Sequence, residues 1–242
     1  MEEIVKKISS TLSLIVMFFL SAVIYFNYKG FVYENGTVVL KKQIADAAEY
    51  NGIAVVLPKD IAINVSQKYA VGSASAPLTM FEYSSLTCPH CADFHLDIMP
   101  FIVREYVDKG LLRVIFVNFP LDKNSMKAAL LSECMTYDNY AGFLNELFYN
   151  QRSWWMDDKD ERLLRYAAQF DLSYDEAQAC IKDKKKAADI VTTRHEALKQ
   201  LNMQGTPAFL ISGADGNEII YGAVNYSSFK EYLDSRLIRL HN

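Results

Sequence analysis

Two cysteines, Cys88 and Cys91, are separated by a proline and a histidine in the segment Cys-Pro-His-Cys. This segment follows the apolar run 78–83 and opens an amphipathic stretch that continues to about Lys109. A thiol at the start of a helix lies beside backbone N–H groups that lack partners, at the positive end of the helix dipole, and both favour the thiolate. The spacing therefore predicts a redox-active pair of thiols.

Metal binding is the alternative chemistry for cysteines at this spacing. A structural zinc site needs two further ligands, whereas Cys134 and Cys180 fall in separate predicted helices, each without a second cysteine two residues away. A soft metal such as copper could be carried by the two thiolates of the motif with His90 or His95. Reversible disulfide exchange is the favoured interpretation, and it needs no cofactor.

The two sulfurs of such a pair have different tasks. Cys88 begins the turn, so we expect its sulfur to be exposed and to attack, while Cys91 lies one turn inward and resolves mixed disulfides. Pro89 suits the first turn of a helix, where its missing N–H is not needed. His90 can direct a hydrogen bond or positive charge toward the Cys88 thiolate, which makes the disulfide a stronger oxidant. The alternative for His90 is a plain exposed loop residue.

The elements around the motif predict a β-α-β unit. The strand Leu78–Tyr83 leads into a helix over Cys88–Lys109, interrupted at Pro100, and then into the strand Leu112–Asn118. So short a connection implies a right-handed crossover between adjacent parallel strands. The turn-forming segment 72–77 precedes this unit and marks a domain boundary, so that the main domain is expected at 72–242.

From about 123 to 202 the pattern becomes almost wholly helical. We expect helices at Ser125–Tyr137, Tyr140–Asn150, Asp158–Phe170, Tyr174–Lys182 and Lys184–Leu201. Strands then return at Ala208–Ile211 and Glu218–Tyr221, and a last helix covers about Ser227–Leu240. The aromatic residues of 140–149 and Trp154-Trp155-Met156 could line a substrate groove, although the core of the helical block is favoured for them.

A proline stands before the first strand that follows the helical block. Gly205-Thr206-Pro207 leads into Ala208, and a proline is sterically tolerated at the first residue of a strand. After a redox pair in this order of elements, however, the segment looks like the cis-proline loop of the thioredoxin fold. Such a loop presents the Thr206 backbone N–H and C=O to an extended substrate, and backbone pairing binds unfolded chains broadly.

The N-terminus carries an apolar stretch, Thr11–Phe26, preceded by Lys6 and Lys7. Extended to 8–28, it reaches about 31 Å as a helix, enough to cross a membrane. No small-x-small cleavage site follows, so an uncleaved anchor at 1–28 is favoured over a cleaved signal. Either way the remainder is exported, with the basic residues inside and the main domain in the periplasm.

Residues 29–71 differ in pattern from the main domain. Two short strands, 31–34 and 37–40, flank Asn35-Gly36, which is a strong hairpin signal. A short helix at 41–50 and an apolar strand at 53–57 are expected next. The segment is interpreted as a membrane-proximal stalk, with an oligomerisation element as the alternative, because apolar strands must be covered by something.

Composition supports an exported globular protein. The 242 residues are 51% hydrophobic and 22% charged, and the net charge is −4. A nucleic-acid partner is not expected, because that function usually needs a clustered basic face, and Lys182–Lys186 is favoured as a solvated helix surface. The four cysteines can form two pairs, as oxidising compartments favour.

From about Pro77 to Leu240 the chain resembles the DsbA-like thiol:disulfide oxidoreductases, in particular those of alphaproteobacteria. The resemblance is carried by Phe81-Glu82-Tyr83-Ser84, by the Cys-Pro-His-Cys motif, by the helical block and by Gly205-Thr206-Pro207. It implies an α/β fold of the thioredoxin type with an all-helical insertion.

Four further expectations come from the resemblance. Glu82 corresponds to a buried acid beneath the disulfide with a proton-relay role, although an exposed strand carboxylate is the alternative. Position 95 is a histidine where the best-known oxidases have an acid, and Thr206 stands where they have valine. Cys134 and Cys180 are expected to form a structural disulfide, with two buried free thiols as the alternative.

Three functions are compatible with these features. The first is an exported oxidase that donates the Cys88–Cys91 disulfide to unfolded or reduced secreted proteins and is reoxidised by a membrane quinone-linked partner of the DsbB type, as the resemblance implies. The second is a disulfide isomerase or reductase, acting as a homo-oligomer through residues 30–70. The third is a copper-binding or tethered interaction protein that uses the same thiols.

Overall fold

The computed structural model describes residues 31–34, 37–40, 54–59, 61, 65–66, 68–156 and 159–241. The chain divides into two compact units, 1–49 and 50–242. Within the first unit, β1 (Phe31–Glu34) and β2 (Thr37–Leu40) pair antiparallel with Glu34 opposite Thr37, which confirms the predicted hairpin. The predicted anchor at 8–28 and the helix at 41–50 lie outside the described residues. Along the described ranges, none of the helices combines the length and the apolar character needed to span a membrane.

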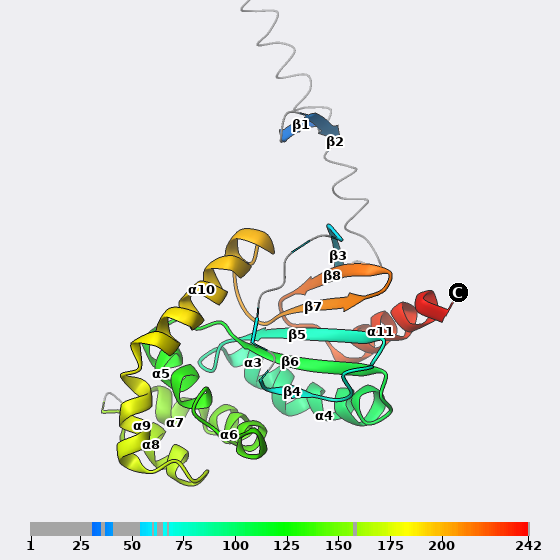
Figure 1. The fold of residues 1–242 in the computed structure, drawn as a ribbon. Helices are drawn as coiled ribbons and strands as arrows, with labels where there is room; N and C mark the ends of the chain where they lie inside the picture. Colours follow the sequence, from blue (N-terminus) through cyan, green and yellow to red (C-terminus); the bar gives the residue numbers. More distant parts are fainter. Residues whose placement is uncertain are drawn as a thin grey trace, which may run out of the picture. The chain divides into compact units, whose positions relative to one another are not determined.

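The second unit is built on a six-stranded sheet, in the order β3-β8-β7-β5-β6-β4 (Figure 1). Its strands are β3 (Ala54–Leu57), β4 (Ala70–Val71), β5 (Leu78–Ser84), β6 (Leu112–Asn118), β7 (Ala208–Gly213) and β8 (Gly216–Tyr221). The predicted parallel pairing of β5 with β6 is confirmed, and the other pairs are antiparallel. Parallel strands are normally covered on both faces, and the mostly buried sequence of β5 and β6 meets that condition.

The sheet begins before the boundary that the sequence suggested at residue 72. β3 pairs with β8, and β4 pairs with β6, so both edge strands of the sheet come from the segment 54–71. Ala54 and Ala70 are buried there. An edge strand of two to four residues carries too little periodicity to be assigned to a sheet from the sequence alone.

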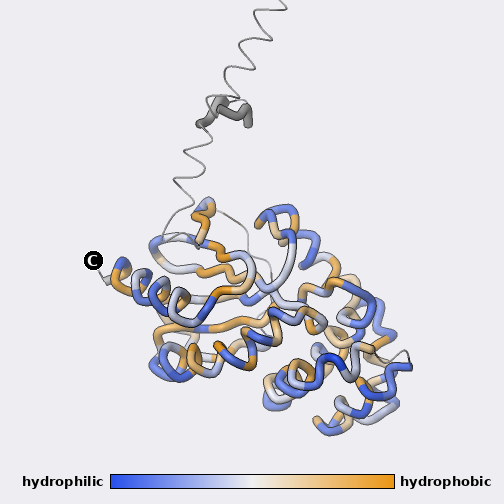
Figure 2. Tube along the Cα trace, turned by 180° about the vertical axis from the view of Figure 1, so that it is seen from behind, coloured by the Kyte–Doolittle hydropathy of each residue, from blue (hydrophilic) through white to orange (hydrophobic). Residues whose placement is uncertain are grey.

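Helices cover both faces of the sheet. Met80, Val114 and Phe209 pack with Phe94 and Phe229 on one face, against the helix after β5 and α11 (Tyr226–His241). The opposite face packs against α10 (Lys184–Gln200) through Ala197, with Leu201 just beyond its end. In Figure 2 the hydrophobic stretches lie mainly in the middle of this unit, and the outer turns of the helices are largely hydrophilic. This is the layered thioredoxin-like arrangement that the resemblance implied.

The helix that follows β5 is divided into four segments rather than interrupted once. They are α3 (Pro89–Asp93), the π-helical η1 (Phe94–Ile98), α4 (Met99–Ile102) and the π-helical η2 (Val103–Val107). Pro100 lacks the N–H that would bond back to residue 96, and a π-turn accommodates such a lost bond. The predicted interruption at Pro100 therefore coincides with the change from η1 to α4.

The insertion between β6 and β7 is helical, as predicted. Its helices are α5 (Lys123–Ser132), α6 (Tyr137–Tyr149), α7 (Gln151–Trp155), α8 (Glu161–Ala168), α9 (Tyr174–Ile181) and α10. α5 ends earlier than expected, so Cys134 lies in the turn between α5 and α6, whereas Cys180 lies in α9. Side-chain caps define several starts, with Asp122 and Ser173 each forming a capping box.

Candidate active site

The two thiols of the motif lie where β5 ends and α3 begins. Cys88 is the N-cap residue, with extended dihedral angles of φ −82° and ψ 119°, and Pro89 follows in the first turn. The Cys91 N–H donates to the Cys88 carbonyl oxygen over 3.1 Å. Both cysteines are free thiols here. Cys91 is fully buried and Cys88 is only 7% exposed, so the attacking sulfur is less open than the sequence suggested.

The surroundings shift the two thiol pKa values in opposite directions. The Cys91 side chain hydrogen-bonds the Cys88 sulfur and lowers its pKa; burial opposes this shift, while Thr206 and the backbone N–H groups of Cys91 and His90 add to it. Burial raises the pKa of Cys91, and the neighbouring Cys88 sulfur raises it further. One sulfur is therefore held as a thiolate near neutral pH and the other as a thiol.

His90 is placed differently from the expectation. Its side chain is 68% exposed, and Nδ1 lies 3.6 Å from the Asp93 carboxylate. The contribution of His90 to the Cys88 thiolate comes through its backbone N–H. The expected imidazole contribution is therefore replaced by a backbone N–H of the helix start, the kind of donor that the position of Cys88 before a helix predicts.

The Thr206–Pro207 peptide bond is cis. The Cys88 sulfur lies 3.3 Å from the Thr206 carbonyl oxygen, to which it donates when it is protonated, although the two residues are far apart in sequence. The Gly222 N–H donates to the Pro207 carbonyl oxygen over 2.8 Å and ties this loop to the end of β8. A hollow of about 450 Å³ lies beside the loop and is lined by Asn202, Gln204, Gly205, Thr206, Tyr221 and Gly222.

Glu82 lies in the middle of β5 and is fully buried. Neither of its carboxylate oxygens has a hydrogen-bond partner among the described residues. Burial raises the pKa of Glu82 to about 8, so the group is largely protonated at neutral pH. The alternative of an exposed strand carboxylate does not hold, because both faces of β5 are covered.

His95 is also buried, one turn after Cys91. Its ring lies 4.8 Å from the Phe148 ring and 6.0 Å from the Phe116 ring, measured between centroids. Burial among these apolar groups lowers the pKa of His95 to about 4. Where the best-known oxidases have an acid, this chain therefore has a neutral imidazole at physiological pH.

Two polar contacts support the motif and were not found from the sequence. The buried Gln151 side chain, on α7, donates to the carbonyl oxygens of Leu86 and Cys88 over 2.9 and 3.0 Å. The Thr87 hydroxyl donates to the Asp122 carboxylate over 2.6 Å. These contacts join the helical insertion to the turn that carries the motif. A glutamine that opens a short helix gives no signal of this role in the sequence.

The other two cysteines form a disulfide, Cys134–Cys180, with a Cα–Cα distance of 6.4 Å. It links the turn after α5 to α9. Trp154, like Tyr140 and Phe143, is buried in the core of the helical insertion, whereas Met156 and Tyr149 are exposed. The favoured core assignment therefore describes Trp154, Tyr140, Phe143 and Phe148 but not Tyr149.

The described residues offer no ready metal site. No group of three or more His, Cys, Asp or Glu side chains comes together in the ranges that the structure covers. Of the two histidines considered as copper ligands, His90 lies beside Asp93, and His95 lies among phenylalanines. The geometry suits thiol chemistry without further ligands.

The relatives of this chain among known proteins agree with one another in fold and in named activity. The profile of the thioredoxin family matches residues 64–235. The chain is 27% identical over 145 residues to a Rickettsia typhi protein named as a protein-disulfide oxidoreductase, with 59% of this chain and 54% of that one covered. It is 27% identical to disulfide bond formation protein D of Bacillus subtilis, covering 69% and 76% of the two chains.

The solved structures agree with these sequence relatives. The crystal structure of Wolbachia pipientis alpha-DsbA1 is similar with a TM-score of 0.67 and 30% identity, over 75% of this chain and 96% of that one. The match to the Rickettsia typhi protein spans about half of that relative's length.

Proposed function

The chain belongs to the thioredoxin family, among its DsbA-like members, and from this we propose that it is a protein thiol:disulfide oxidoreductase that acts through Cys88 and Cys91. The observation that carries the proposal is the Cys88 sulfur, held with a lowered pKa at a helix start and 3.3 Å from the carbonyl oxygen of a cis-proline loop. A nucleophile and a backbone binding edge thus lie side by side.

The exchange proceeds in two displacements. A client thiolate attacks the Cys88 sulfur of the Cys88–Cys91 disulfide, the S–S bond breaks, and Cys91 leaves with the electron pair. Because burial disfavours the Cys91 anion, it takes a proton, for which the protonated Glu82 is the source. A second client thiolate then attacks the client sulfur of the mixed disulfide and releases Cys88 as a thiolate. The client loses two electrons and the dithiol gains them.

The pKa difference supports oxidation as the direction. A stabilised Cys88 thiolate lowers the free energy of the reduced protein, so the disulfide is more readily given away. The cis-proline loop would hold an extended client by its backbone, with Thr206 contributing its N–H and C=O. The clients are therefore reduced or unfolded secreted proteins, chosen by conformation rather than by sequence.

The cellular location of the enzyme is part of the same proposal. The apolar stretch 8–28, with Lys6 and Lys7 before it, would anchor the chain in the inner membrane and place the catalytic unit in the periplasm. A structural disulfide between Cys134 and Cys180 suits an oxidising compartment. There a quinone-linked membrane partner of the DsbB type would restore the Cys88–Cys91 disulfide.

Refolding of ribonuclease tests the proposal. The oxidised full chain should restore activity to reduced ribonuclease quickly and to scrambled ribonuclease slowly. Cys88→Ser should abolish exchange, while Cys91→Ser should accumulate mixed disulfides. Rapid recovery of scrambled ribonuclease, together with an oligomer in sedimentation, would favour an isomerase instead. Any truncation used for sedimentation should keep residues from 50 onward, because β3 belongs to the sheet.

A further inference from the structure

The helical insertion holds three consecutive residues of the turn that leads into the motif helix. Gln151, in the first turn of α7, donates from its side-chain amide to the carbonyl oxygens of Leu86 and Cys88 over 2.9 and 3.0 Å. The Thr87 hydroxyl between them donates over 2.6 Å to the carboxylate of Asp122, the N-cap residue of α5. The main chain that carries Cys88 is therefore attached to the insertion at each of the residues 86, 87 and 88.

The two bonds of Gln151 use both hydrogens of its amide. Carbonyl oxygens only accept, so the NH2 end of the side chain must face them. Gln151 and Leu86 are both buried, so water cannot readily replace the donor if it is lost. The Cys88 carbonyl oxygen also accepts from the N–H groups of Cys91 and Ala92, over 3.1 and 3.2 Å. Gln151 therefore acts on the same carbonyl group from which the motif helix begins.

α7 is itself fixed within the insertion. The ring of the buried Trp154 donates from Nε1 to the Leu147 carbonyl oxygen over 2.7 Å, which joins α7 to α6. The hydroxyl oxygens of Ser153 and Tyr166 lie 3.0 Å apart and join α7 to α8. The position of Gln151 is therefore set by the insertion as well as by the turn that it contacts.

The direction of the Cys88 side chain decides how readily exchange occurs. Its sulfur lies 3.3 Å from the Thr206 carbonyl oxygen, and the backbone N–H groups of His90 and Cys91 stabilise its thiolate. An attacking thiolate must also approach in line with the bond to Cys91 that breaks. A small rotation of the main chain at Cys88 would move the sulfur away from these groups, and a displacement of about 1 Å at a reacting atom can cost about a hundredfold in rate.

Building on the proposed function, we infer that Gln151 is a positioning residue for disulfide exchange, because it fixes the main chain from which the Cys88 sulfur meets the incoming thiolate. It acts through the Leu86 and Cys88 carbonyl groups rather than on the client. The helical insertion, which carries Gln151, is in this way part of the exchange machinery and sets the reactivity of the motif.

Gln151→Met tests the inference, because methionine keeps the length of the side chain and removes both donors. The oxidised full chain is mixed with dithiothreitol or with a reduced model peptide, quenched in acid, and its Cys88 and Cys91 thiols are counted by alkylation and mass. Both reactions should slow roughly tenfold. Equal losses with the two reductants place the defect at the sulfur, because dithiothreitol has no peptide backbone for the cis-proline loop to bind.

A second readout separates positioning from a merely structural role. In the reduced protein, the midpoint pH of Cys88 alkylation should move upward in Gln151→Met, since the sulfur would lie farther from the N–H groups of the helix start. Gln151→Asn keeps the amide but is one methylene too short for both carbonyl oxygens, and it should change the rate and the midpoint in the same direction. It decides the test if Gln151→Met fails to fold.

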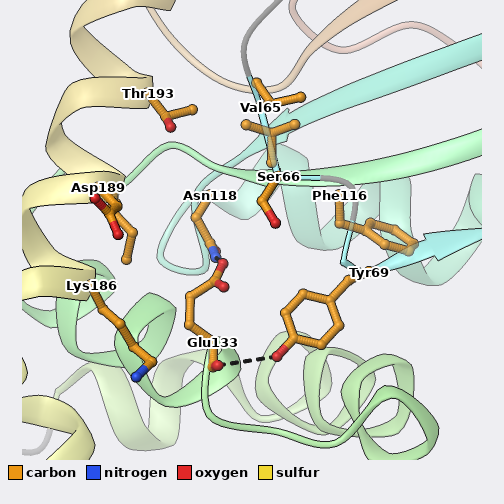
Figure 3. A pocket seen from close by; sticks show the side chains of 11 residues that line it. Val65, Ser66, Tyr69, Phe116, Asn118, Glu133, Lys186, Asp189 and Thr193 are labelled. Atoms are coloured by element: carbon orange, nitrogen blue, oxygen red, sulfur yellow. Dashed lines mark hydrogen bonds between the residues drawn. The ribbon is translucent and has the colours of Figure 1, made fainter.

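The matched control is Glu133→Met, which removes another hydrogen bond between the insertion and the sheet. Glu133 follows α5, and its carboxylate accepts from the side-chain amide of Asn118, at the end of β6, over 2.9 Å. Figure 3 shows these two side chains pointing toward one another in a groove of about 170 Å³ beside α10. Glu133→Met should be less stable in urea but should keep the wild-type exchange rate and the wild-type alkylation midpoint.

Three outcomes would overturn the inference: a wild-type rate and midpoint in the folded Gln151 variant, a loss of rate confined to the peptide, or an equal loss in Glu133→Met. Failure of the proposed function is a different result. In that case the wild-type oxidised chain would leave the reduced peptide unoxidised, whereas failure of the inference alone leaves wild-type exchange intact.

Discussion

At the residue scale, two thiols three positions apart acquire opposite acid–base behaviour from a few contacts. The Cys88 sulfur receives hydrogen bonds from the Cys91 side chain and from backbone N–H groups, while Cys91 is fully enclosed. The helix start supplies the backbone donors, as expected for an N-cap position. The largest single contribution at Cys88 is nevertheless its partner in the disulfide.

This dependence gives a prediction for Cys91 variants of the reduced protein. The pKa of Cys88 is lowered to about 5, so alkylation by iodoacetamide should reach half its maximal rate near that pH. Cys91→Ala removes the main donor and should move the midpoint upward. Cys91→Ser keeps an O–H donor and should leave the midpoint low. Equal midpoints in the two variants would contradict the assignment of that donor.

Sequence alone identifies the residues whose spacing along the chain marks them. Cys88, Cys91 and the pair Thr206-Pro207 belong to this group, because a motif and a turn signal announce them. Gln151 could not be found, since it reaches backbone carbonyls 65 and 63 positions away. Such contacts are made by the fold and leave no local pattern.

At the element scale, α11 is fastened to the β7–β8 hairpin by a buried arginine. The guanidinium of Arg236 is fully enclosed, lying 2.6 Å from the Asp215 carboxylate and 3.3 Å from that of Glu218. Arg239 contacts the same two acids at 3.5 and 2.7 Å, but it is 29% exposed. A buried ion pair is costly to break on one side only.

Arg236→Met should therefore lower the free energy of unfolding by about 3–5 kcal/mol, because two acids lose a buried partner. The matched change Arg239→Met removes a more exposed partner of the same acids and should cost about 1 kcal/mol or less. Urea denaturation of both variants measures the difference. Similar losses in the two would mean that burial does not distinguish these arginines.

The Cys134–Cys180 disulfide closes a loop of 46 positions across the helical insertion. Constraint of the unfolded chain by a loop of this length is worth about 4 kcal/mol, so Cys134→Ala/Cys180→Ala should be less stable by about that amount. The redox motif lies elsewhere, and we expect the variant to retain exchange at temperatures where it is folded. Denaturant curves measure the stability of the variant, and a ribonuclease refolding assay measures its exchange activity. An unchanged free energy of unfolding would contradict a stabilising role for the disulfide.

Elements were predictable to different degrees. The β5-helix-β6 unit and the helical insertion follow from apolar periodicity and caps, as at Ser173. The division of the redox helix into α and π segments was not predictable beyond Pro100, because π-turns depend on local packing. β4 has two residues and takes its identity from pairing with β6.

At the scale of the whole molecule, one buried carboxyl group affects stability. Burial raises the pKa of Glu82 to about 8 in the folded protein, against 4.5 for its ordinary value. Between these pH values the folded protein holds a proton that the unfolded chain has released. Stability from this group is therefore present at low pH and decreases as the pH rises toward 8.

Glu82→Gln should remove this pH dependence in the reduced protein. The free energy of unfolding of Glu82→Gln minus that of the wild type should increase with pH from about pH 4.5 to 8. At pH 7 this difference should exceed its value at pH 4.5 by about 3 kcal/mol. Cys88 titrates equally in both proteins and cancels in the difference. Urea curves at several pH values measure the effect. A constant difference across this range would show that Glu82 is ionised when folded.

The cis-proline loop beside Cys88 offers main-chain groups, and a neighbouring main chain can use them only while its own hydrogen bonds are unmade. Which polypeptides bind therefore depends on how quickly they fold. A newly arrived polypeptide is accepted in the interval before its strands and helices form. A fast-folding protein would bury its cysteines unoxidised, and a slow one would be oxidised while it is still open.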